Sequence, residues 1–242
     1  MFRHFTRFLA FGSILVGTGC AGSYKAIQPD RIATYQSTAT FPASPVEFSY
    51  QYSALITHGG NKKYLKKERK RGYQVVAVKV KNNTSTELQF GRDLELSFGN
   101  RPIMPVPAVQ AASDLKQGVA IYLLYLLLNF QIGGTTTSNG YGQTTTTGGT
   151  FLPTGPFIAA GNMVGAGMAN ANLRKEFMQY DIANKIIRPG ETVFGIISLR
   201  ETNVAPLNLS LRNQAAATSP SAQPAVPQPS PASSPAPSGS GR

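Results

Sequence analysis

Residues 73–85 read YQVVAVKVKNNTS, and the assignment of the fold depends on this stretch. Valine occupies four of the first nine positions, and its branched side chain favours the extended backbone of a strand. The cluster Asn82-Asn83-Thr84-Ser85 that follows is typical of a turn. The stretch therefore predicts a strand that ends at residue 81 and is followed by a tight turn.

Shorter segments on both sides of this stretch also have the pattern of strands. Apolar and polar residues alternate in residues 46–52, 94–98 and 207–211, as in a strand with one buried face. Residues 193–199 are mostly apolar, and Leu88 and Phe90 begin a further short element. Turn clusters separate these segments, so we expect antiparallel strands packed as a β-sandwich.

The turns carry a resemblance to a known type of domain. A strand ending in Val-Lys-Val-Lys-Asn-Asn-Thr at residues 78–84, a leucine-alternating strand after it, and the turn Arg188-Pro189-Gly190-Glu191-Thr192 before an apolar strand resemble the immunoglobulin-like sandwich of many uncharacterised bacterial lipoproteins. The resemblance implies a sandwich built from residues 45–102 and 181–212. The chain has no tryptophan and one cysteine, so only the architecture of antibody-type domains is implied. Turn motifs imply no reaction.

Residues 117–173 contain no Asp, Glu, Lys or Arg, although charges are frequent just outside this range. Residues 118–130 are apolar all round and follow the capping residues Ser113 and Asp114, which predicts a helix with an apolar environment. A second helix is predicted from Pro156 to about Tyr180 after a Thr/Gly/Ser loop. The whole prediction is a mainly β protein whose immunoglobulin-like sandwich is interrupted by an apolar helical hairpin at residues 103–180.

The second helix carries Gly161, Gly165 and Ala169 at four-residue spacing. This spacing places small residues on one helix face, where another backbone approaches closely in membrane helix pairs. We expect the hairpin to pack on the sandwich or on a second copy of the protein, with partial membrane insertion of residues 117–173 as the alternative. The first apolar run has about 13 to 15 residues, fewer than the roughly 20 that a membrane span needs, which favours packing.

A basic cluster accounts for about half of the net charge of +12. Residues 61–71 hold one acidic residue and seven basic ones: Lys62, Lys63, Lys66, Lys67, Arg69, Lys70 and Arg71. Charge runs are commonly solvated loops or short helices, and we expect one here between two strands. The alternative is contact with an anionic membrane surface or acidic glycan, since nucleic acid is not within reach of an exported protein.

The N-terminus has the layout of an export signal. Arg3 and Arg7 precede an apolar run at residues 8–16, small residues and then Cys20. This layout resembles the lipobox of bacterial lipoproteins, with Gly17 in place of the usual leucine. The resemblance implies a signal peptide at residues 1–19, acylation of Cys20, and a lipid-attached linker at residues 20–44. A signal cut near Gly22, an uncleaved anchor and an unmodified thiol are the alternatives.

Localisation and the C-terminal tail follow from composition and resemblance. Asp directly after the acylated cysteine marks inner-membrane retention in enterobacterial lipoproteins, so Ala21 implies the outer membrane, with the protein facing the periplasm. Residues 213–242 are almost entirely Ala, Ser, Pro, Gln and Gly, and such a segment cannot bury a core. We therefore expect this tail to be disordered.

The sequence contains little that points to catalysis. Mature His58 has no Cys, Asp or Glu neighbour, so no metal site is predicted, and Gly59-Gly60 lacks the context of a phosphate loop. Asp93 and Glu95 are interpreted as solvent-facing strand residues. We expect no enzyme and no cofactor. Two classes are left: a structural or interaction lipoprotein with an envelope partner or second copy, and a binding module for anionic glycans or lipid headgroups.

Overall fold

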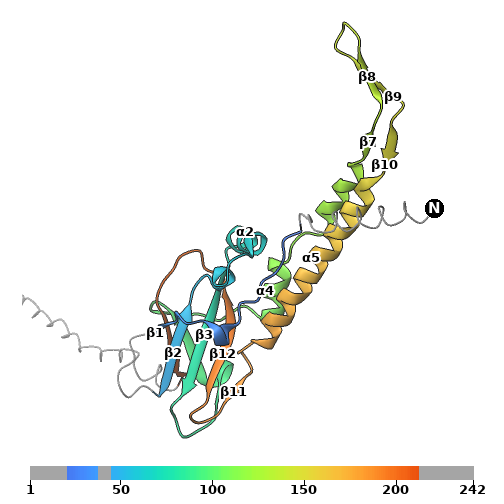
Figure 1. Cartoon of the computed structure of the whole chain (residues 1–242). Coiled ribbons are helices and arrows are strands. Elements are labelled where there is room, and N and C mark those ends of the chain that lie inside the picture. The colour runs from blue at the N-terminus through green and yellow to red at the C-terminus, as the bar shows by residue number, and fades with distance from the viewer. Residues whose placement is uncertain (1–20, 38–44, 213–242) are drawn as a thin grey trace, which may run out of the picture.

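The computed structural model describes residues 21–37 and 45–212 of the chain, which form a body and a projecting arm (Figure 1). The body contains antiparallel sheets and three helical elements that cover them. The predictions for the signal peptide, Cys20, part of the linker and the Pro/Ala/Ser-rich tail lie outside the described residues.

The central sheet has four antiparallel strands in the order β1-β2-β3-β12. Their bounds are Gln36–Ser37, Val46–Gln51, Gln74–Asn82 and Thr192–Leu199. In β3, Val78 lies opposite Tyr50 of β2 and Gly195 of β12. The strands predicted at residues 46–52, 73–81 and 193–199 are thereby confirmed.

A second, three-stranded sheet packs on one face of the central sheet. Its middle strand β5 (Leu94–Phe98) lies between β6 (Arg101–Pro102) and β13 (Leu207–Leu211). The short pair β4 (Leu88–Gln89) and β11 (Ile186–Ile187) extends this layer, and the helical turn α3 (Phe90–Asp93) connects β4 to β5. The shared core consists of alternate side chains from both sheets, including Phe48, Val76, Leu96, Ile197 and Leu207.

Asn82 is hydrogen-bonded to both of the turns that carry the resemblance to the immunoglobulin-like sandwich. The Asn82 side chain is fully buried, and its amide nitrogen donates to the carbonyl oxygens of Thr86 at 2.7 Å and Ile187 at 2.9 Å. Its carbonyl oxygen Oδ1 accepts the Thr84 N–H at 2.9 Å, and its backbone carbonyl accepts the Gly190 N–H at 2.7 Å. The turn after β3 is therefore joined to the turn before β12.

Helices cover the opposite face of the central sheet. They are α2 (Lys62–Arg71), α4 (Ala108–Leu115) and the C-terminal half of α5 (Thr154–Gln179). Two short 3₁₀ turns, η2 (Pro29–Arg31) and η3 (Ala54–Ile56), lie on the same side. Their core side chains include Tyr64, Leu115, Leu173 and Phe177, packed on Val75 of β3. The fold is therefore a mixed one of open antiparallel sheets and helices, and the prediction of a mainly β class is corrected.

The arm corresponds to the charge-free insertion and extends away from the body (Figure 1). It contains the N-terminal half of α5, the 3₁₀ helix η4 (Ala120–Leu127), and a β-hairpin beyond them. The hairpin pairs β7 (Phe130–Ile132) with β10 (Thr150–Leu152), and β8 (Thr135–Ser138) with β9 (Thr144–Thr147). The predicted long first helix is wrong, because only residues 120–127 are helical. The predicted loop is a hairpin, since its threonine runs are β-branched.

Candidate functional site

The arm depends on a close contact between η4 and α5. An ideal Cβ atom on Gly155 would lie 2.5 Å from the Tyr125 carbonyl oxygen, 2.7 Å from that of Leu126 and 2.8 Å from that of Leu128. No side chain fits there, so glycine is required at this position. The buried positions Ala159, Asn162, Ala166 and Ala169 continue this face of α5 toward the body. Gly155 was not among the residues singled out from the sequence, although its four-residue spacing from Ala159 was a usable signal.

The three small residues singled out from the sequence do not act together. A Cβ atom built on Gly161 would meet no atom within 4 Å, and one built on Gly165 would lie 3.3 Å from the Cβ atom of Ala21. Ala169 is buried in the core of the body. Positions four apart rotate by about 40° around a helix at each step, so these residues turn progressively away from a common neighbour. Within the described chain the stripe therefore has no common helix partner, and a Cβ atom at its middle position would meet the N-terminal segment.

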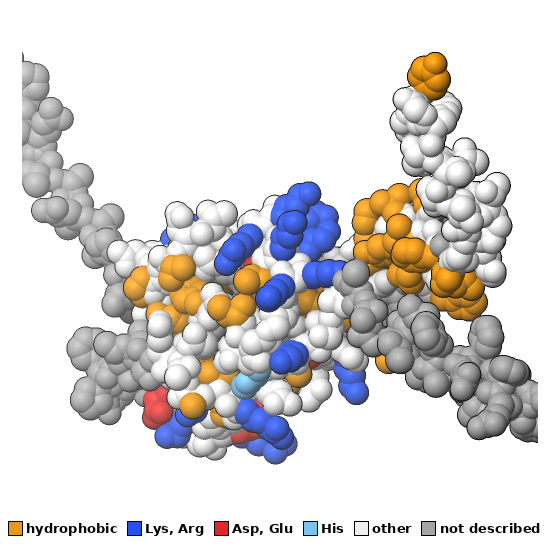
Figure 2. All heavy atoms as spheres, turned by 45° about the horizontal axis from the view of Figure 1, so that its top comes forward, with side chains coloured by type: hydrophobic (Ala, Val, Ile, Leu, Met, Phe, Trp, Pro, Cys, Tyr) orange, Lys and Arg blue, Asp and Glu red, His pale blue; other side chains and the backbone are white. Residues whose placement is uncertain are grey.

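Large apolar side chains are exposed around the arm. Along η4, Tyr122 contacts Lys63 and Tyr125 and is 3% exposed, whereas Ile121, Leu124 and Leu127 are 60%, 62% and 80% exposed. We use the term apolar girdle for the exposed set Ile121, Leu123, Leu124, Leu126, Leu127, Leu128, Phe130, Ile132, Phe151 and Phe157. Figure 2 shows this apolar surface on the arm next to the hairpin. A patch of this kind marks an interaction surface in a stable protein.

The N-terminal segment 21–28, here called the strap, is held against the helices by buried polar groups. Glu176 on α5 accepts the backbone N–H groups of Ile27 at 3.0 Å and Gln28 at 2.8 Å, and also the Tyr24 hydroxyl. Burial and the nearby Glu176 carboxylate raise the pKa of Tyr24, so its hydroxyl is a permanent donor. Asn61, just before α2, bonds to both the N–H and the carbonyl of Lys25 at 2.9 and 2.8 Å.

The beginning of the strap lies on the arm itself. The Ala21 N–H donates to Oδ1 of Asn162 at 2.7 Å, and the Gln117 amide donates to the Gly22 carbonyl at 2.7 Å. Asn162 lies on α5 and is buried. These bonds fix the positions of Ala21 and Gly22 on the arm. The predicted anchor residue Cys20 lies outside the described residues, but its bonded neighbour is held at the arm.

The basic cluster forms the helix α2; the prediction was a solvated loop or a short helix between two strands. Tyr64 and Glu68 are buried, and Gly72 ends the helix with a φ of 65°. Lys62, Lys66, Arg69, Lys70 and Arg71 are exposed, while Lys63 and Lys67 are half-buried. Within the described ranges, the ion pairs include none of the exposed cations Lys62, Lys66, Arg69, Lys70 and Arg71. The helix therefore presents a strongly cationic surface.

Lys63 joins this cationic surface to the arm. Its ammonium nitrogen donates to the Tyr122 hydroxyl at 2.6 Å and lies 5.0 Å from the centre of the Tyr122 ring. Figure 2 shows basic side chains on the body close to the apolar patch of the arm. The two surfaces that the sequence suggested separately are thus neighbours in space.

Glu68 is the acidic residue on the buried face of α2. Its Oε1 atom accepts the Val75 N–H at 2.7 Å, which attaches the helix to β3. Burial raises the pKa of Glu68 to about 7, although the bond from Val75 and the positive charge of Arg69 oppose this shift. The group is therefore partly protonated at neutral pH.

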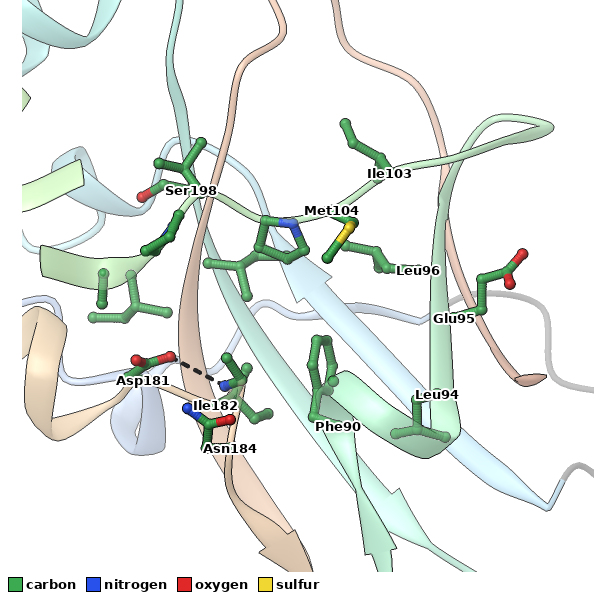
Figure 3. A pocket seen from close by; sticks show the side chains of 18 of the residues that line it. Phe90, Leu94, Glu95, Leu96, Ile103, Met104, Asp181, Ile182, Asn184 and Ser198 are labelled. Carbon is green, nitrogen blue, oxygen red and sulfur yellow. Dashed lines mark hydrogen bonds between the residues drawn. The ribbon is translucent and has the colours of Figure 1, made fainter. Parts of the chain in front are cut away.

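A groove of about 830 Å³ lies between the second sheet and the end of α5 (Figure 3). Phe90, Leu94, Leu96 and Ile182 give it an apolar lining, and Asp181 uses Oδ1 to accept the N–H of Ala183 at 3.0 Å. The described lining of the groove is therefore mainly apolar.

The remaining candidates for catalysis are also accounted for by structure. Asp93 lies at the end of α3, where the Arg92 guanidinium and the Gln89 N–H lower its pKa to about 2. Glu95 follows on β5, where it lies opposite Ser210 of β13. Within the ranges that the structure describes, no cluster of three or more His, Cys, Asp or Glu residues is placed to hold a metal ion.

Comparison of the chain with known protein families, with curated proteins and with solved structures found no match. Within residues 21–37 and 45–212, no helix has both the length and the apolar character needed to cross a membrane.

Replacing Gly155 with Ala should detach η4 from α5, because the added methyl group would overlap three carbonyl oxygens. Hydrogen exchange of the amides of residues 120–128 should accelerate by about tenfold or more, as expected for a loss of local stability. Gly161→Ala is the matched control, since the space above Gly161 is open. Equal exchange rates in the two variants would show that the close contact does not hold the arm together.

Glu68→Gln should change how stability depends on pH. The folded pKa of Glu68 is about 7, above its ordinary value of 4.5, so stability is fully present below about pH 4.5 and is lost as pH rises to 7. The loss is about 3 kcal/mol at most. Urea unfolding should show the variant more stable than wild type at pH 8 and nearly equal to it at pH 4.5. The same difference in the free energy of unfolding at pH 8 and pH 4.5 would contradict the raised pKa of Glu68.

Proposed function

We propose that this chain is a non-enzymatic, lipid-anchored protein of a bacterial cell envelope with a structural or protein-interaction role, and that the arm is its contact surface. The observation that carries this proposal is the apolar girdle, where Leu124 and Leu127 are 62% and 80% exposed in a segment without charge. Exposure of this much apolar surface to water is unfavourable, so a contact that covers it is stabilising.

The proposed location rests on the N-terminal signal and Cys20. Acylation of Cys20 attaches the mature chain to a membrane, and Ala21 favours the outer membrane with the protein facing the periplasm. The strap supports this arrangement, because the bond between Ala21 and Asn162 holds the attachment end beside the contact surface.

The proposal includes the immunoglobulin-like class of sandwich. It is supported by the core shared between the β2-β3-β12 strands and the β5-β13 strands, and by Asn82 between the two turns that carry the resemblance. Such a domain serves as a scaffold, and its function depends on the sites added to it. Here the added element is the arm.

A second candidate function is the binding of an anionic glycan or lipid headgroup by α2. The exposed cations Lys62, Lys66 and Lys70 favour it, since these three residues take no part in the ion pairs of the described ranges. Strong positive charge concentrated on one helix attracts anions over several ångströms.

The contact role can be tested by thiol labelling in intact envelopes. Leu127→Cys in the full chain should be protected from a water-soluble maleimide, because the girdle is covered by its partner. Val204→Cys is the matched control, since Val204 is 72% exposed on the body and should be labelled rapidly. Equal labelling at both positions would refute the contact role. Wild type should stay unlabelled because Cys20 is acylated, and labelling of wild type would refute the lipid anchor.

The second candidate function is tested with a different set of substitutions. Reversing Lys62, Lys66 and Lys70 to Glu should weaken binding of the soluble polyanion polygalacturonate by about tenfold or more, because each cation near an anionic surface contributes about 1 kcal/mol. The matched control reverses the exposed residues Arg31, Lys79 and Lys185. Equal weakening in both triple variants, measured by titration at low salt, would attribute binding to net charge and reject a site on α2.

A further inference from the structure

Four residues from different parts of the chain meet at one level of the arm, and we call them the collar: Ala21, Lys63, Tyr122 and Asn162. Ala21 is bonded to Asn162 at 2.7 Å, and Lys63 to Tyr122 at 2.6 Å. The two pairs are neighbours, because a Cβ atom built on Gly22, the residue after Ala21, would lie 3.0 Å from Cδ of Lys63. The collar therefore combines the chain's attachment end, a cation of α2 and the base of η4.

The chemistry of the surface changes at the collar. On the side of the body, charged residues begin with Lys116 before η4 and Arg174 on α5. On the far side lie the apolar girdle and then the uncharged hairpin, with Tyr141 exposed in its turn. This order matches a membrane surface, where anionic headgroups attract cations and the acyl chains beneath them accept apolar side chains.

We infer that the surface covering the apolar girdle is a lipid bilayer, with the arm lying in the membrane interface and α2 facing anionic headgroups. This inference rests on the proposed lipid-anchored function and names the partner of the same site. Ala21, the residue after the proposed acylation site, is held at the collar by its bond to Asn162. A lipid anchor at that end of the chain and the girdle would meet the same bilayer.

The secondary structure of the arm sets how deep it lies. None of the described helices can cross a membrane. In the described part of the chain, β7 pairs with β10 and β8 with β9, so the hairpin's outer strand edges have no ladder partner. Backbone groups without partners are costly in hydrocarbon but are satisfied by water and headgroups at the interface. The arm is therefore placed along the interface, where an amphipathic element is buried by about 5 to 10 Å.

Charge distinguishes a bilayer from a second copy of the chain. Lys63 of α2 contacts Tyr122 at the edge of the girdle, so two girdles packed together would bring two cationic helices close to each other. Like charges oppose that arrangement, and the net positive charge of the chain adds to the repulsion. An anionic bilayer is attracted by α2 and also covers apolar side chains, so both surfaces gain from the same contact.

The absence of tryptophan in the sequence permits a direct test. Leu127→Trp in the full chain places a single indole in the girdle, and Val204→Trp places one on the body at a similarly exposed position. Each variant is reconstituted into vesicles of phosphatidylcholine and phosphatidylglycerol, with and without bromine at positions 6 and 7 of the acyl chains. Bromine quenches an indole only by contact, so the measurement separates lipid from protein as the neighbour.

The expected result is blue-shifted emission from Leu127→Trp that is quenched at least about twofold by brominated lipid, with little change for Val204→Trp. Blue-shifted emission without quenching would show that protein covers the girdle, which overturns the bilayer but leaves the proposed contact role. Red-shifted emission without quenching would show an arm exposed to water beside the bilayer and overturn the inference, whereas the contact role is refuted only by equal labelling of Leu127→Cys and Val204→Cys in intact envelopes. Circular dichroism of each variant against wild type verifies the fold, and Leu124→Trp repeats the test if Leu127→Trp fails to fold.

Discussion

The burial of β3 on both faces is the constraint on which the rest of the structure depends. Val75 and Ala77 face the helices, while Val76, Val78 and Val80 face the second sheet, and all five are fully buried. Each face must be covered, because exposed valine and alanine would lose the free energy of burial. The second sheet covers one face, and α2, α4 and the end of α5 cover the other. The arm is stable because the same α5 continues out of this core.

The strap is bonded to this core and thereby fixes where the N-terminal end of the described chain lies. Glu176 lies in α5 where the helix joins the body, and it satisfies two backbone N–H groups that would otherwise be buried without partners. Leaving such donors unpaired costs roughly 1 to 3 kcal/mol each, so the strap is firmly held. Its first residue, Ala21, is thereby placed on the arm. The proposed anchor, the cationic helix and the apolar girdle consequently lie at one end of the molecule.

Several elements were predictable because their signals are local. The alternation at residues 46–52 and 207–211 and the valines of residues 73–81 predicted strands that the structure contains. The first arm helix was overestimated, since an apolar run of this length does not distinguish a helix from a 3₁₀ turn followed by a strand. Gly155 was missed because its role depends on carbonyl groups that lie about 30 residues away in sequence. Lipidation of Cys20 and the nature of the partner stay predictions.

The sequence by itself determined the strands, the cationic helix and the absence of charge in residues 117–173, because each depends on residue type and on spacing over a few positions. Only the tertiary structure decided that Ala21 lies against Asn162 and that Lys63 lies against Tyr122. These contacts join residues 59 to 141 positions apart. They arise from the packing of α2, η4 and the strap around one helix, a geometry that no local pattern specifies.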